Sequence, residues 1–207
     1  MRNQKIDAAI KSAKEKAVDI FSDLPSELIT GVRTLFLIER AKDGCHNKEE
    51  RRNFNFTVVD SEEKILKKIT EFLWIKELYP NNKLRIYLSV NARNKKRAVR
   101  NIHESIITSL YSDEENQEQI NTKISKGARS YIMNPNARET KYFLIDVDNE
   151  PGKDIMGEIL HEMARLDIKE IYRRSTRNGW HIVVHPFNLG LWKGTAEIKK
   201  DGLILLD

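Results

Sequence analysis

The sequence predicts an α+β fold, in which helices and strands interleave along the chain. Segments with the 3.6-residue apolar spacing of amphipathic helices alternate with short apolar or alternating segments that are typical of strands. The chain has 207 residues, enough for one sizeable domain or for one domain with a small appendage. Hydrophobic residues make up 40% of it and charged residues 32%, which fits a globular protein with a heavily charged surface. Interleaved elements of this kind pack as layers of helix on sheet.

The first half of the chain contains two well-marked helices and two strand segments. They are a helix over residues 3–20, a strand or short buried helix over 32–39, a strand over 53–60, and a helix from 60 to about 79. Asp60 followed by Glu63 forms a capping box that begins the second helix, and Pro80 ends it. Between the two strand segments, residues 41–53 have the composition of a solvated loop.

The second half alternates strands and helices more regularly. The expected elements are strands over 84–90, 141–148, 168–174, 180–185 and 203–207, and helices over about 92–111 and 154–166. The acidic stretch 113–119 fits a linker or the charged end of a helix, and Pro135 lies in a turn. We find no internal repeat and no low-complexity tract.

Charge, cysteine content and hydropathy restrict the compartment and the partners. The net charge of +5 favours anionic partners on average. Cys45 is the only cysteine, which excludes an internal disulfide and a multi-cysteine metal site and suits a reducing compartment. No apolar run approaches the ~20 residues that span a bilayer, and the lysine-rich N-terminus lacks the hydrophobic core of a signal peptide. We therefore expect a cytoplasmic protein without a membrane partner.

The segment 141–148 is an apolar strand that ends in two carboxylates, Asp146 and Asp148. Side chains two residues apart on a strand point the same way, about 6–7 Å apart at a rise of ~3.3 Å per residue. Both faces are apolar up to Asp146, so we expect a central strand with the acids where it leaves the core. Two like charges this close are unfavourable unless a cation lies between them or one carboxylate takes a proton.

Two interpretations of this acidic pair stay open. Magnesium is bound by one or two protein carboxylates together with substrate phosphates, and a pair of metals can clamp the reacting oxygens of a phosphoryl transfer. The structural alternative is that the two aspartates end the strand and cap the next helix without a metal. The residues 149–152 (NEPG) already supply turn and capping chemistry, which leaves the aspartates without that task.

A second polar segment, residues 175–181 (STRNGWH), leads into an apolar strand and ends with His181. Glycine permits a close backbone approach, which is useful beside a phosphate, and Arg177 can fork onto phosphate oxygens. A lone histidine on a strand is more often a satisfied core residue than a functional one. His185 lies ~13 Å further along the strand, too far to share a metal ion with His181, so a zinc site is not expected.

Together, FLIDVD (143–148), STRNGWHIVV (175–184) and LILLD (203–207) resemble the archaeo-eukaryotic primase superfamily, which includes primase-polymerases and the polymerase domains of bacterial end-joining ligases. That family carries D-x-D or D-x-E at a strand end, then an S-x-H or S-x-x-G-x-H-like loop and strand, and then a final acid after an apolar strand. His181 follows Asp148 by 33 residues, which leaves room for one helix and one strand. The order and spacing of the three motifs carry the resemblance.

The resemblance implies a primase-polymerase-like catalytic core with a central mixed β-sheet, one half of it RRM-like, flanked by helices. Residues 81–207 would form this core. Residues 1–80 would be an N-terminal helical or mixed region packed on it, unless the whole chain forms one continuous domain.

The resemblance also implies roles for individual residues. The catalytic carboxylates that bind Mg²⁺ or Mn²⁺ would be Asp146, Asp148 and Asp207. The residues that contact the incoming nucleoside triphosphate would be Ser175, Arg177 and His181. Asp207 is the terminal residue of the sequence, where chain ends fray.

A basic stripe is expected on the helix predicted over residues 92–111. Arg93, Lys96, Arg97 and Arg100 recur at i, i+3, i+4 and i+7, and apolar residues lie on the opposite side. Such a stripe predicts sequence-independent, salt-sensitive binding to the phosphate backbone of a nucleic acid. The alternative is an ordinary solvated helix face.

Three functions are consistent with these features. The first is a template-dependent, metal-dependent nucleotidyltransferase of the primase or DNA polymerase kind, which makes or extends a nucleic acid strand from nucleoside triphosphates. The second is a non-catalytic, primase-like protein that binds nucleic acid or nucleotide as a replication accessory. The third is a metal-dependent phosphodiesterase or nuclease that uses the same acids on a water nucleophile.

Overall fold

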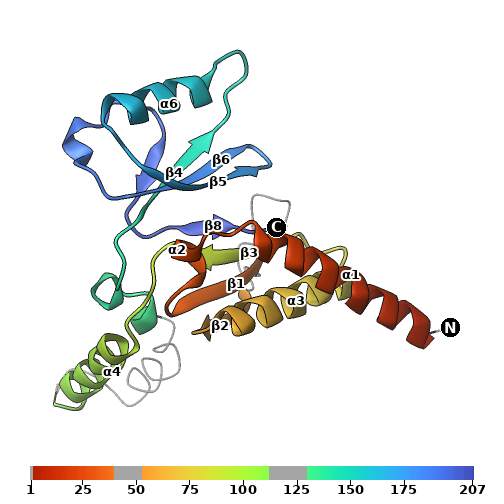
Figure 1. The fold of residues 1–207 in the computed structure, drawn as a ribbon. Helices are drawn as coiled ribbons and strands as arrows, with labels where there is room; N and C mark the ends of the chain where they lie inside the picture. The colour runs from red at the N-terminus through yellow and green to blue at the C-terminus, as the bar shows by residue number, and fades with distance from the viewer. Residues whose placement is uncertain (1, 40–52, 112–129) are drawn as a thin grey trace.

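The computed structural model describes residues 2–39, 53–111 and 130–207. These residues form two antiparallel sheets with helices packed against them, so the predicted α+β fold is confirmed (Figure 1). The predicted linker 113–119 lies outside these ranges, as does all but the last residue of the predicted loop 41–53. No helix within the described ranges is long and apolar enough to cross a membrane.

The first sheet is built by strands from distant parts of the chain. Its strands are β1 (Arg33–Glu39), β2 (Asn53–Val59), β3 (Leu84–Ser89) and β8 (Leu203–Leu205), in the order β2-β1-β3-β8. The long helices α1 (Arg2–Ser22) and α3 (Glu62–Leu78) pack against each other and cover one face of this sheet (Figure 1). The short helix α2 (Ser26–Ile29) lies between α1 and β1 in the chain. Fully buried apolar side chains such as Leu35 and Phe72 fill the layer between sheet and helices.

Ser61, and not the predicted Asp60, caps the N-terminus of helix α3. The hydroxyl of Ser61 accepts a hydrogen bond from the backbone N–H of Lys64 at 3.3 Å. The carboxylate of Asp60 instead pairs with Lys64 and Lys95, and these hydrogen bonds lower the pKa of Asp60 to about 2. Asp60 thereby connects the start of α3 to the start of α4 (Lys95–Leu110).

The second sheet carries the two motif segments. Its strands are β4 (Phe143–Asp148), β5 (Glu170–Thr176), β6 (Gly179–Val184) and β7 (Glu197–Lys199), in the order β5-β6-β4-β7. Strand β4 is central and apolar on both faces, as the sequence predicts. Ile145 and Val147 pack toward helix α6 (Ile155–Arg165), whereas Leu144 joins the core of the first sheet. The two aspartates of β4 alternate with Ile145 and Val147, so they share the face of Leu144, between the two sheets.

The expectation of one central mixed sheet is wrong, because every pairing among the named strands is antiparallel and the strands divide into two sheets. Apolar alternation indicates which faces of a strand are buried, but not the direction of its neighbours. Here a two-residue connection, Arg177–Asn178, joins β5 to β6 and imposes antiparallel pairing.

Strands from both sides of the predicted boundary at residue 80 share the first sheet. β1 and β2 precede that boundary, and β3 and β8 follow it. The core under this sheet also contains Leu144, Tyr172 and Val183 from the second sheet. A single buried core therefore runs from the N-terminal helices into the second sheet, and the division at residue 80 stays a prediction.

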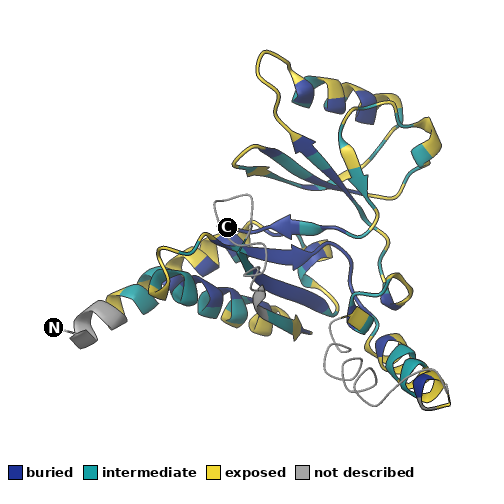
Figure 2. Ribbon diagram, turned by 180° about the vertical axis from the view of Figure 1, so that it is seen from behind, coloured by how far each residue is buried: buried dark blue, intermediate teal, exposed yellow. Residues whose placement is uncertain are grey.

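Helix α4 extends away from both sheets (Figures 1 and 2). Asn94 caps its N-terminus, and its side-chain oxygen accepts a hydrogen bond from the N–H of Arg97 at 3.1 Å. Ala98 anchors the first turns against Ile132 and Ala137, which lies in the short 3₁₀ helix η3 (Pro135–Ala137). Most of the described α4 surface is exposed or half-buried, so the helix is displayed rather than enclosed.

Candidate active site

Four side chains of the second sheet stand in one row across its strands. The register pairs Arg174 of β5 with His181 of β6, His181 with Asp146 of β4, and Asp146 with Glu197 of β7. Directly opposed residues in antiparallel strands share a face and have Cβ atoms about 4.5–5.5 Å apart. The structure therefore brings Asp146 and His181 together on one face, as the sequence predicts, and adds a carboxylate that the prediction missed.

This row borders a cavity of about 390 Å³ that is lined mainly by polar side chains. The lining residues are Arg85, Tyr87, Asp146, Asp148, Thr176, Arg177, Asn178, His181, Glu197, Lys199 and Leu205. The cavity lies between the two sheets, because β3 and β8 supply one wall and β4, β6 and β7 supply the other. We call it the acidic pocket, after its three carboxylates.

Asp146 is the most strongly paired of these carboxylates. Nε2 of His181 lies 3.4 Å from its Oδ1, and the ammonium of Lys199 contacts its Oδ2. The hydrogen bond from His181 holds the pKa of Asp146 well below its ordinary value, and the hydrogen bond from Lys199 adds to this, while burial opposes both. Asp146 is therefore an anion at neutral pH and presents a fixed negative charge at the centre of the row.

His181 is fixed as one tautomer by the other sheet. The backbone N–H of Leu205 in β8 donates to Nδ1 of His181 at 3.1 Å. A nitrogen that accepts a hydrogen bond carries no proton, so the proton of the neutral ring is on Nε2, the atom that faces Asp146. The first sheet thus orients the imidazole that the second sheet supplies.

Asp148 differs from Asp146 because its carboxylate is exposed and makes no hydrogen bond or ion pair with the part of the chain that the structure describes. The cap of helix α6 is Asp154, whose Oδ1 accepts from the N–H of Gly157 at 2.9 Å. Neither aspartate at the end of β4 caps that helix, so the purely structural interpretation of the pair loses its main support.

Gly179 allows β6 to pass close to β4 at this point. A Cβ atom at this position would lie 1.8 Å from the carbonyl oxygen of Val147. The glycine was expected to permit a close approach beside a phosphate. In the structure, glycine is needed here because β6 and β4 approach closely. This approach sets the distance between His181 on β6 and the aspartates on β4.

Glu197 is the third carboxylate of the acidic pocket, and the sequence analysis missed it. It lies on β7, a strand of three residues that also carries Lys199. The alternation of polar and apolar residues over 196–199 (AEIK), between two glycines, is the signal that could have found this strand. Its side chain is 70% exposed, so it can adjust its position.

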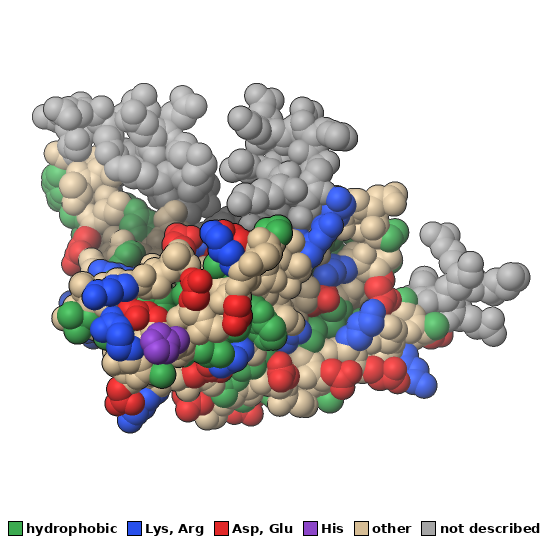
Figure 3. All heavy atoms as spheres, turned by 90° about the horizontal axis from the view of Figure 1, so that it is seen from above, with side chains coloured by type: hydrophobic (Ala, Val, Ile, Leu, Met, Phe, Trp, Pro, Cys, Tyr) green, Lys and Arg blue, Asp and Glu red, His purple; other side chains and the backbone are tan. Residues whose placement is uncertain are grey.

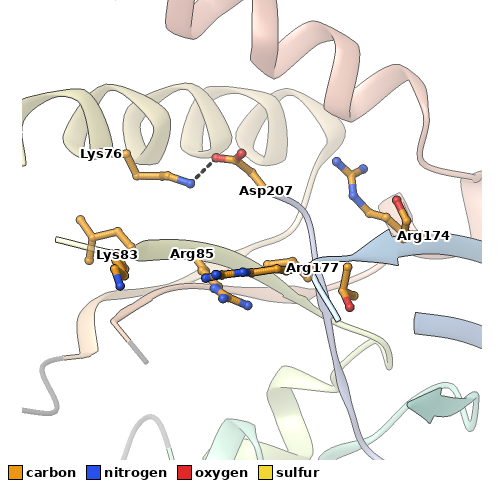
Figure 4. Close-up of a pocket in the computed structure, with 10 residues that line it drawn as sticks. Lys76, Lys83, Arg85, Arg174, Arg177 and Asp207 are labelled. Atoms are coloured by element: carbon orange, nitrogen blue, oxygen red, sulfur yellow. Dashed lines mark hydrogen bonds and ion pairs between the residues drawn. The ribbon is translucent and has the colours of Figure 1, made fainter. Parts of the chain in front are cut away.

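Asp207, the predicted third acid, lies elsewhere. Its carboxylate pairs with Lys76 of α3 and lines a second cavity of about 390 Å³ next to the acidic pocket (Figure 4). Five basic side chains line the same cavity: Lys76, Lys83, Arg85, Arg174 and Arg177. Strand β8 pairs with β3 and not with β4, which carries its final residues toward α3 and away from Asp146.

We call this second cavity the basic pocket. It adjoins the acidic pocket, because Arg85, Thr176, Arg177 and Leu205 line both. Figure 4 shows Arg85 and Arg177 at the same cavity as the ion pair between Lys76 and Asp207. The charges of Arg85 and Arg177 therefore border both pockets.

Ser175 and Arg177, the other predicted nucleotide contacts, both line the basic pocket. The two arginines that precede Arg177 are neutralised, because Arg173 pairs with Glu170 and Arg174 with Asp23. Arg177 is exposed at the hairpin turn and forms no ion pair with any described residue. It is the arginine of this hairpin whose charge is available to a ligand.

The predicted basic stripe on α4 loses one member. Arg93 precedes the helix, has no exposed surface, and forks onto Asp201 with N···O distances of 3.0 and 2.6 Å. A buried guanidinium with a carboxylate partner cannot reach a phosphate, so the prediction that Arg93 binds nucleic acid is wrong. Lys96, Arg97 and Arg100 are exposed on α4, as predicted.

The face of the molecule seen from above shows no concentrated basic patch among the described residues (Figure 3). On the face seen from above, lysine and arginine side chains are interspersed with acidic ones (Figure 3). Mixed charge of this kind is the ordinary surface of a soluble domain and does not mark an interface. The basic pocket and the exposed cations of α4 are thus the more specific anion-attracting features.

In the described part of the chain, no three His, Cys, Asp or Glu side chains are grouped closely enough to enclose a metal ion. Magnesium does not require such a cage, because it usually keeps several waters and takes one or two carboxylates together with substrate phosphates. The donor set of the acidic pocket fits this pattern, and the ammonium of Lys199 between Asp146 and Glu197 marks a position that suits a cation.

No protein-family model, curated protein sequence or solved structure matches the chain.

Proposed function

We propose that the protein is a metal-dependent nucleotidyltransferase of the primase-polymerase kind, which adds nucleotides to a nucleic acid strand on a template. The observation that carries this proposal is the row in which Asp146 stands between His181 and Glu197, with Asp148 beside it at the same cavity. Carboxylates from neighbouring strands, an imidazole N–H beside them and an adjoining basic pocket are the parts that this chemistry needs.

The carboxylates would hold Mg²⁺ or Mn²⁺ at the acidic pocket. Asp148 offers both oxygens to solvent, Asp146 is fixed as an anion, and Glu197 is free to swing on an edge strand. Divalent metal bound there would neutralise charge on the attacking and leaving oxygens as a 3′-hydroxyl displaces pyrophosphate at the α-phosphate. Asp207 has no part in this set, because it is paired with Lys76 in the other pocket.

The basic pocket would take the phosphates that extend from the reacting centre. Arg177 lines both pockets and lacks a carboxylate partner among the described residues, so it can neutralise a phosphate that bridges them. Thr176 lies next to it at the same junction. Holding the triphosphate from one end aligns its α-phosphate with the acids, and alignment supplies much of the rate in this kind of reaction.

His181 would donate a hydrogen bond rather than act as a base. Its Nδ1 accepts a hydrogen bond from the N–H of Leu205, so its own donor is the N–H on Nε2. This N–H faces Asp146, and a phosphate oxygen bound beside Asp146 would share it. Such a donor stabilises a phosphate oxygen without any covalent bond to the protein. The exposed cations of α4, Lys96, Arg97 and Arg100, would contact the strand backbone.

A second candidate function is binding without catalysis. It is favoured by one observation, the position of Asp207, which leaves the acid predicted from the resemblance outside the acidic pocket. A protein of this kind would hold nucleotide or nucleic acid in the basic pocket and would need no metal.

An extension assay tests the proposal. The protein is incubated with Mg²⁺ or Mn²⁺, labelled nucleotides, and a primed or an unprimed template. We expect template-dependent product that disappears in Asp146→Asn and persists in Glu158→Gln, which removes one exposed charge from α6 on the other side of the sheet. Shortened template that depends on Asp146 would indicate a phosphodiesterase instead. Retained nucleic acid binding without either product would support the binding protein.

A further inference from the structure

The carboxylate of Asp146 has both oxygens engaged by side chains of its own pocket. His181 lies at Oδ1, and Lys199 contacts Oδ2 while its ammonium is also 3.2 Å from Oε2 of Glu197. A divalent cation takes at least one carboxylate oxygen as a direct ligand. A cation that binds this carboxylate therefore has to share an oxygen with one of these partners or displace it, and sharing is least favourable with a partner that is itself a cation.

Lys199 is the partner that can withdraw. The imidazole of His181 is held from behind by the N–H of Leu205, and its side chain is only 12% exposed. Lys199 lies on the edge strand β7, and its side chain is 36% exposed. A lysine ammonium ends a flexible four-carbon stem, so it can leave the carboxylate without moving the backbone.

Lys199 also performs the electrostatic task of a metal. Two carboxylates of neighbouring strands converge on its ammonium, and Asp148 lines the same cavity. Without a metal, the ammonium of Lys199 thus reduces the repulsion among the carboxylates of the acidic pocket.

We infer that Lys199 is a built-in competitor for the divalent metal: it occupies the cation position of the acidic pocket and is displaced when Mg²⁺ or Mn²⁺ binds Asp146. This inference rests on the proposed function, because it concerns the metal that this function requires. Its consequence is that the protein binds metal more weakly than its carboxylates alone would allow. Removing the ammonium strengthens metal binding.

Titration of the full chain with Mn²⁺ by calorimetry tests this. In Lys199→Met the Mn²⁺ affinity rises about fivefold, the amount expected for loss of one partly exposed ion pair. The matched control is Lys200→Met, which removes the same charge from the next residue, an exposed one. It changes the affinity less than twofold, because a solvent-exposed charge without a direct contact is screened by salt. Asp146→Asn abolishes the binding in either background.

The outcomes separate this inference from the function on which it rests. If no variant binds Mn²⁺ in a way that depends on Asp146, the proposed metal site fails and the nucleotidyltransferase with it. If the wild-type protein binds Mn²⁺ through Asp146 but Lys199→Met binds it no more tightly than Lys200→Met, the function stands and the competition is refuted.

A measurement on the wild-type side chain guards against a variant that fails to fold. The lysines are ¹³C-methylated, and the resonance of Lys199 is identified by its absence in Lys199→Arg. Addition of Mg²⁺ moves this resonance toward the position of exposed lysines if the ammonium is displaced. A resonance that stays in place while Mg²⁺ saturates the Asp146-dependent site overturns the inference.

Discussion

Replacement of Arg93 by methionine separates a folding role from a nucleic-acid-binding role. The guanidinium of Arg93 is fully buried and donates two hydrogen bonds to Asp201, whose side chain is 17% exposed. Methionine keeps most of the volume and removes both hydrogen bonds and the charge. Asp201 then remains as a largely buried carboxylate, with the side-chain amide of Asn91 at 3.4 Å as its remaining donor.

Removal of one partner from a buried ion pair destabilises a protein by about 3–5 kcal/mol. The partial exposure of Asp201 and its contact with Asn91 place the expected loss at the lower end, about 3 kcal/mol. For a chain of this size each kcal/mol shifts Tm by about 2–4 °C, so the expected decrease is about 6–12 °C. The double variant Arg93→Met/Asp201→Leu recovers much of this loss, because no unpaired charge is left.

Urea unfolding followed by circular dichroism measures the change, and Lys96→Met is the control. Lys96 is exposed on α4, so its replacement changes the free energy of unfolding by less than about 0.5 kcal/mol. It should instead weaken nucleic acid binding and reduce its salt dependence. A stable Arg93→Met protein that loses nucleic acid affinity like Lys96→Met would refute the structural role of Arg93.

Three further outcomes are expected. Gly179→Ala forces a Cβ to within 1.8 Å of the carbonyl oxygen of Val147 and destabilises the protein by roughly 3 kcal/mol or more, with faster amide hydrogen exchange in β4. The hydrogen bond from Arg165 lowers the pKa of Glu162 from 4.5 to about 2, so ionised Glu162 stabilises the fold above pH 4.5 and this contribution disappears toward pH 2. In urea unfolding, the free energies of unfolding of Glu162→Gln and wild type should therefore converge as the pH falls. Glu197→Gln lowers nucleotide incorporation at least about tenfold, whereas Asp207→Asn leaves it within about twofold.

Much of the second sheet followed from the sequence. An apolar run on both faces of the segment 143–148 indicated a central strand, and the two-residue period placed Asp146 on the side away from Ile145. The same period placed His181 opposite Trp180 and Ile182. Both inferences depend on local backbone geometry, which a strand imposes on its own residues.

Long-range pairings were not predictable in this way. A solvated arginine and a buried one have the same appearance in a charge pattern, and the partner of Arg93 lies 108 residues away. The acidic pocket likewise takes Glu197 from a strand of three residues, and an alternation this short does not indicate which strand β7 pairs with. Asp207 was placed by its order in the chain, whereas its position depends on which sheet β8 joins.

The central claim is that Asp146 and Asp148 hold divalent metal beside His181. Crystals soaked with Mn²⁺ and a non-hydrolysable nucleoside triphosphate test this by anomalous diffraction. The account predicts an anomalous peak within about 2.5 Å of oxygens of Asp146 and Asp148, with triphosphate extending toward Arg177. A peak at other residues, or triphosphate bound with Lys199 still on Asp146 and no manganese in the pocket, would contradict it.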